Sequence, residues 1–198
     1  LTELVKSIQP AVATVVAYDV NNNVANIGTG FFVNKYGHLI TNHHVLIGKF
    51  GAEIRTADGS TYRIRTIVAE NQETDLIKVS VDIPSEKIRW LTVSDEVPPV
   101  AEQVVVVGSP MGLEQSVSDG IVSSVREIPG LGTFFQMSAP TGGADPFLAG
   151  CTDAFQSFGE GPAIPASVLV YGHFRPLPCL LSRTIPSVLS SPCTPDLL

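Results

Sequence analysis

The most informative stretch of the sequence is Leu39-Ile40-Thr41-Asn42-His43-His44-Val45, a short apolar strand that ends in Thr-Asn, with two histidines at the start of a turn. A second stretch, Glu73-Thr74-Asp75-Leu76-Ile77-Lys78-Val79, opens another strand with an acid, and the interval from His44 to Asp75 has room for a hairpin. Histidine can take and return a proton near neutral pH, and a carboxylate on its far ring nitrogen would fix the tautomer. A serine hydroxyl needs such a base to become a nucleophile. On spacing alone, a structural histidine and a strand-capping acid are the more common explanation, and a catalytic pair is the alternative.

The strands around these stretches are short and closely spaced. Residues 1–8 have the apolar spacing of a short amphipathic helix that ends before Pro10. Asp58-Gly59 is a strong hairpin signal. Strands are predicted at residues 11–18, 28–33, 38–41, 52–56, 61–68, 75–81, 104–107, 117–125 and 133–137. Many short strands with almost no helix are typical of β-barrels and β-sandwiches.

Composition narrows the class of protein. Of the 198 residues, 44% are hydrophobic and 16% are charged, which excludes a chain too polar to fold. The net charge of −7 argues against nucleic acid or an anionic membrane as a partner. No apolar run approaches the roughly 20 residues that span a bilayer. The sequence contains neither a metal-ligand cluster nor a phosphate-cradling loop, so we expect no cofactor, and we place Trp90 in the core.

Five motifs, in order along residues 1–140, resemble the protease domain of the HtrA/Deg family of trypsin-like serine endopeptidases. Besides the two stretches quoted above, they are Gly28-Thr29-Gly30-Phe31, residues 107–113 with 120–123, and residues 135–139. The resemblance makes His44 the general base and Asp75 the acid that orients it, and it leaves His43 at a variable position. It implies an all-β fold of the chymotrypsin/trypsin type, two six-stranded Greek-key barrels with the active site between them. The first barrel would take residues 1–96, and the second would start at residues 97–140.

The resemblance ends near residue 140. The family continues with a Gly-Asn-Ser-Gly loop whose serine is the nucleophile, and that serine is expected near position 146. This chain instead has Thr141-Gly142-Gly143-Ala144-Asp145-Pro146-Phe147, and no Gly-x-Ser-Gly follows. Residues 141–198 contain no lysine, all three cysteines and eight of the 15 prolines, and their one good strand candidate is Ala166–Tyr171. We therefore expect an incomplete second barrel, followed by a tail at 141–198 that is frameshifted or disordered.

Three interpretations of function follow from this pattern. The first is a serine endopeptidase by family, inactive as this exact chain because its nucleophile loop is missing. The second is a pseudoprotease that binds peptides without chemistry, although the presence of both His44 and Asp75 counts against it. The third is a damaged fragment with no function of its own. By resemblance, the substrate would be a peptide or an unfolded protein, the location periplasmic or extracellular, and the assembly a trimer as in many relatives.

Overall fold

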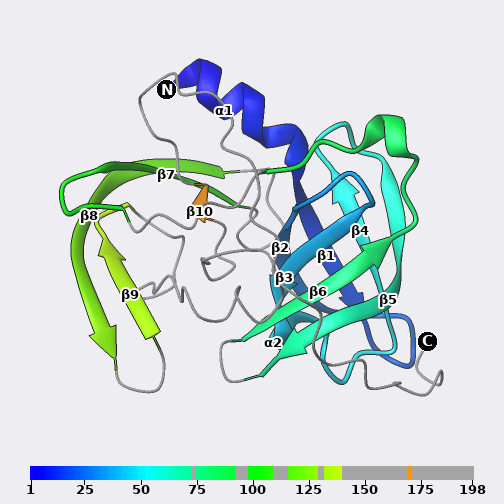
Figure 1. The fold of residues 1–198 in the computed structure, drawn as a ribbon. Helices are drawn as coiled ribbons and strands as arrows, with labels where there is room; N and C mark the ends of the chain where they lie inside the picture. The colour runs from blue at the N-terminus through cyan, green and yellow to red at the C-terminus, as the bar shows by residue number, and fades with distance from the viewer. Residues whose placement is uncertain (73–74, 92–97, 109–115, 129–131, 140–168, 171–198) are drawn as a thin grey trace, which may run out of the picture.

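The structure, a computed structural model, describes the chain apart from residues 73–74, 92–97, 109–115, 129–131, 140–168 and 171–198. Its secondary structure is mostly β-strand (Figure 1). The helical elements are α1 (Thr2–Ile8), the 3-10 turn η1 (Gln9–Ala11), α2 (His43–Leu46) and the 3-10 turn η2 (Ser85–Lys87). The strands are β1 (Val12–Tyr18), β2 (Val24–Phe32), β3 (His38–Asn42), β4 (Gly51–Thr56), β5 (Thr61–Asn71), β6 (Leu76–Val81), β7 (Gln103–Gly108), β8 (Ser116–Ile128), β9 (Gly132–Met137) and β10 (Leu169–Val170).

The first six strands close into a barrel in the order β1-β2-β3-β6-β5-β4. Strand β1 closes it by pairing antiparallel with both β2 and β4, so that Val15 lies opposite Gly28 on one side and Ile54 on the other. The predicted β4–β5 hairpin is confirmed, and Gly59 takes the positive φ of 79° that its turn requires. At this turn, the Thr56 hydroxyl and the Ser60 backbone N–H donate to the Asp58 carboxylate, and such hydrogen bonds lower the pKa of Asp58 to about 2.

Alternation along the strands fills the barrel with apolar side chains. Phe32, Leu39 and Ile77 point inward and are at most 1% exposed. Their neighbours in sequence, such as Ile40 and Leu76, point to the outer face of the barrel and are equally buried. Both faces of β3 and β6 are therefore covered by apolar side chains where Ile40 and Leu76 lie.

The second sheet has the order β10-β7-β8-β9, and among the described strands it does not close. Strand β8 is central, pairing with β7 on one side and with β9 on the other. Strand β10 adds only two residues, Leu169 and Val170, opposite Val106 and Val105 of β7. A smaller core cluster covers one face of this sheet, formed by Val104, Val106, Val122, Met137 and Ala139.

The two sheets share a third apolar cluster. Val105 and Val107, on the other face of β7, pack with residues of the outer barrel wall such as Ile40 and Leu76. Helix α1 covers this junction with Leu4 and Val5, which matches its position above both sheets in Figure 1. The cluster fixes the second sheet against the side of the barrel that carries β3 and β6.

The predicted all-β fold, with one closed six-stranded barrel and an incomplete second one, is confirmed. The N-terminal helix and all predicted strands are present, and within the predicted strand Ala166–Tyr171 the structure forms β10. The placement of Trp90 in the core is wrong, because its neighbours Ile88 and Leu91 take the apolar sites and leave Trp90 49% exposed. The predicted boundaries at 96–97 and 140–141, and the tail at 141–198 apart from β10, lie outside the described residues.

Candidate active site

The two predicted site residues meet at one end of the closed barrel. Strand β3 runs directly into the single turn of α2, which places His43 and His44 at the rim. In the β3–β6 pair, Asn42 lies opposite Leu76, so the residue before β6, Asp75, stands beside the first turn of α2. The backbone N–H of His43 donates to the Asp75 carbonyl at 3.0 Å.

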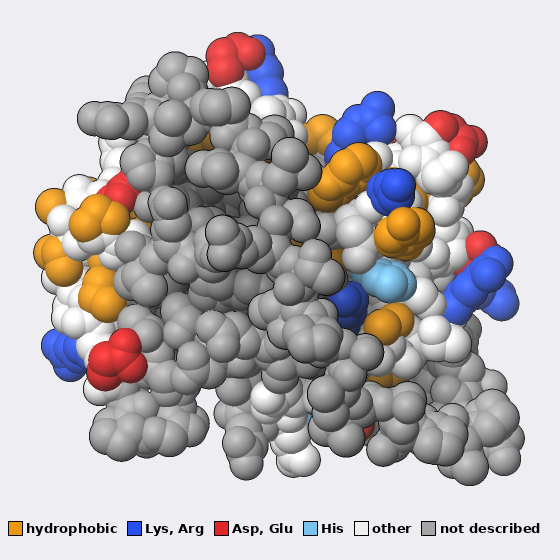
Figure 2. Space-filling model, viewed as in Figure 1, with side chains coloured by type: hydrophobic (Ala, Val, Ile, Leu, Met, Phe, Trp, Pro, Cys, Tyr) orange, Lys and Arg blue, Asp and Glu red, His pale blue; other side chains and the backbone are white. Residues whose placement is uncertain are grey.

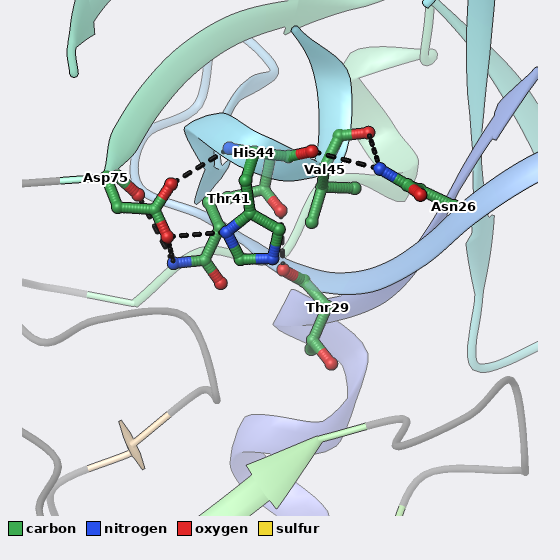
Figure 3. Close-up of polar contacts among 7 residues, drawn as sticks. Asn26, Thr29, Thr41, His44, Val45 and Asp75 are labelled. Atoms are coloured by element: carbon green, nitrogen blue, oxygen red, sulfur yellow. Dashed lines mark hydrogen bonds and ion pairs between the residues drawn. The ribbon is translucent and has the colours of Figure 1, made fainter. Parts of the chain in front are cut away.

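The side chains of His44 and Asp75 are in direct contact (Figure 3). Nδ1 of His44 lies 2.6 Å from Oδ2 of Asp75, a distance typical of a short, charge-assisted hydrogen bond. The His44 side chain is 67% exposed and that of Asp75 is 41% exposed. Among the described residues, Nε2 of His44 has no hydrogen-bond partner. The ring is thus held at one nitrogen and open at the other.

Two further donors fix the Asp75 carboxylate. The backbone N–H of His44 donates to Oδ1 at 2.9 Å, and the Asn42 side-chain amide donates to Oδ2 at 3.0 Å. Asp75 itself has φ of 56°, a left-handed conformation that costs on the order of 1 kcal/mol for a residue with a side chain. These hydrogen bonds, with that of the Asn42 amide to the Asp75 carbonyl at 3.2 Å, offset this cost. Sequence reasoning assigned no role to Asn42, although the residue lies in the motif that was quoted.

His43 has a different environment from its neighbour. It is only 7% exposed, and its Nε2 lies 3.4 Å from Oε2 of Glu70 near the end of β5. Strand β5 pairs with β6 there, with Glu70 opposite Ile77. His43 therefore anchors α2 to the barrel wall, while His44 projects from the rim. Nothing near Glu70 in the sequence indicated this contact.

Comparison with known proteins shows the family of the chain. The trypsin-like peptidase domain family matches residues 28–145, which include both His44 and Asp75. The chain belongs to this family. Within it, the protease domain is of the HtrA type, as the relatives below indicate.

The relatives are proteases of this type. The serine protease HTRA1 of Xenopus laevis is 33% identical over 134 residues, 64% of this chain and 28% of that protein. A probable periplasmic serine endoprotease, DegP-like, of Chlamydia trachomatis is 32% identical over 99 residues, 49% of this chain and 19% of that protein. The chain thus spans less than a third of the length of these relatives. The crystal structure of the serine endoprotease from Yersinia pestis superposes with a TM-score of 0.61 at 20% identity, covering 84% of this chain and 53% of that one.

Charged side chains of both signs occur on the described surface. On the face drawn in Figure 2, basic and acidic side chains of the described residues lie singly or in small mixed groups, with hydrophobic side chains between them. The described ranges contain no group of three or more His, Cys, Asp or Glu side chains that could hold a metal ion. No helix among them is long and apolar enough to cross a membrane.

Proposed function

We propose that His44 and Asp75 are the general base and the orienting acid of an HtrA-type serine endopeptidase site. The observation that supports this proposal is the 2.6 Å contact from Nδ1 of His44 to Asp75, which leaves Nε2 open. With the carboxylate on Nδ1–H, the lone pair of Nε2 can take the proton of a serine hydroxyl as its oxygen attacks a peptide carbonyl. The same nitrogen then returns the proton to the leaving amine, while Asp75 stabilises the imidazolium.

We propose further that this exact chain does not hydrolyse peptides. Its sequence contains no Gly-x-Ser-Gly, and Pro146 stands where the family pattern expects the nucleophile. Loss of a triad serine lowers turnover roughly 10⁶-fold, about 8 kcal/mol of barrier. The base and acid would then be in position without a hydroxyl to activate.

The test is covalent labelling with a fluorophosphonate probe, combined with hydrolysis of an unfolded protein substrate. The matched control is His44→Ala, which removes the base and leaves every serine in place. We expect no labelling and no hydrolysis by either protein. Labelling of the original chain that is lost in His44→Ala would contradict inactivity. Peptide binding by both proteins, without hydrolysis, would favour a peptide-binding role instead.

The remaining functional expectations derive from the family. An extended peptide or unfolded protein is the proposed substrate class, since proteases of this type act on proteins. A periplasmic or extracellular location is proposed with the DegP-like relative in view. Assembly as a trimer, and the division into a first barrel at 1–96 and a second from 97, stay predictions.

A further inference from the structure

The helical turn that carries His44 is held at both ends by residues outside the helix. At its start, consecutive backbone N–H groups of His43 and His44 donate to the carbonyl and the carboxylate of Asp75. At its end, the side-chain amide of Asn26 on β2 donates to the carbonyls of His44 and Val45, at 2.9 and 3.3 Å (Figure 3). The helix is therefore clamped between Asp75 and Asn26.

The carbonyls of α2 can be accounted for one by one. At the end of the helix, the N–H of Ile47 donates to the His43 carbonyl. The N–H of Lys49 donates to the Leu46 carbonyl. The carbonyls of His44 and Val45 are left, and an asparagine amide has two N–H donors. Asn26 supplies these to the two carbonyls that the backbone does not reach.

Strand β2 is shaped to let α2 approach. Two residues after Asn26, on the same face of the strand, stands Gly28. A Cβ atom at Gly28 would lie 2.6 Å from Cγ2 of Val45, closer than real contacts allow. The missing side chain at Gly28 lets Val45 rest on the strand and brings the α2 carbonyls within reach of Asn26.

We propose that Asn26 is a positioning residue for the general base, acting through the carbonyl of His44 itself. This inference rests on the proposed role of His44. Because Asp75 holds the ring at Nδ1 and Asn26 holds the main chain of the same residue, the two together fix the direction of Nε2. A one-turn helix has too few internal bonds to fix that direction by itself.

The test compares Asn26→Asp with Asn26→Gln. The aspartate has the shape of asparagine but no N–H donor, and it places a carboxylate against two carbonyl oxygens. The glutamine keeps the amide donors. Asn21→Asp, in the exposed loop before β2, is the control for the added charge. The readouts are the ring ¹⁵N chemical shifts of neutral His44, which report the tautomer, and hydrogen exchange of the Ile47 N–H.

In Asn26→Asp, we expect His44 to populate both tautomers and the Ile47 N–H to exchange roughly tenfold faster. Asn26→Gln and Asn21→Asp should keep the original tautomer and exchange rate. An Asn26→Asp protein that matches the original chain in both readouts would overturn the inference, as would Asn26→Gln with the same defect as Asn26→Asp. A proton on Nε2 in the original chain would refute the proposed function instead, and Ile47 exchange would still test the clamp.

Discussion

In the closed first barrel and in the open second sheet, the first three strands along the chain pair in order, β1-β2-β3 and β7-β8-β9. The two regions differ in the strands that follow. In the barrel, β1 pairs with β2 on one side and β4 on the other, and β5 and β6 complete the ring. In the second sheet, β7 pairs with β8 on one side and with the two-residue β10 on the other. Strand β9 forms the opposite edge among the described strands. The comparison teaches that both residues of the His44–Asp75 pair lie in the region that closes, beside the wall of the barrel on which the second sheet packs.

The largest difference should appear in native-state hydrogen exchange. Strand β6 lies inside a closed ring and carries Ile77 and Val79, both fully buried. Strand β9 pairs with β8 on one side only among the described strands. We expect amides of β6 to exchange at least about 100-fold more slowly than those of β9, about 2.7 kcal/mol in opening free energy. Equal protection in the two strands would mean that the second sheet opens only with the barrel.

Core truncation tests the same contrast energetically. Ile77→Ala in the barrel should lower the free energy of unfolding by about 3–5 kcal/mol, because a closed ring of buried neighbours cannot collapse into the cavity. Met137→Ala is the matched change in the second sheet, where the side chain is 2% exposed. Met137→Ala should lower the free energy of unfolding by less, about 2 kcal/mol, since the residues of an open sheet can move into the cavity more easily. Urea unfolding of both variants measures this, and a larger loss for Met137→Ala would reverse the contrast.

Gly120 in the second sheet allows a test with a smaller expected effect, which concerns one close backbone contact. A Cβ atom at Gly120 would lie 2.4 Å from the backbone nitrogen of Ala139, so Gly120→Ala must push two backbone segments apart. We expect Gly120→Ala to lower the free energy of unfolding by about 1–3 kcal/mol. Gly51→Ala in β4 is the control, because nothing lies within 4 Å of its added Cβ. Thermal unfolding compares them. If both variants melted alike, β8 and the segment at Ala139 would not be packed as the structure has them.

Much of the fold follows from sequence because the strands carry their own signals. Alternation and turn residues located the helix and the strands, and the Asp58-Gly59 hairpin was predicted from two residues. Trp90 was misplaced, since composition alone does not show that Ile88 and Leu91 fill the nearby apolar sites. The shortness of β10 could not be predicted either, because pairing with β7 depends on a distant partner.

The candidate site also contains contacts that the sequence predicted and contacts that it did not. The contact between His44 and Asp75 was expected from two motifs, and the structure brings these residues together. Asn26 and Glu70 had no such signal, because each reaches α2 from another strand, outside the two motifs. Contacts of this kind depend on which strands become neighbours in the folded barrel.

The tautomer of neutral His44 tests the central claim most directly. Ring ¹⁵N chemical shifts of the original chain should show the proton on Nδ1, facing Asp75, and a bare Nε2 able to accept a proton. In Asp75→Asn, the ring should shift toward the Nε2–H form, because an amide can donate to Nδ1. A proton on Nε2 in the original chain, or an unchanged tautomer in Asp75→Asn, would contradict the assignment of His44 and Asp75 as base and orienting acid.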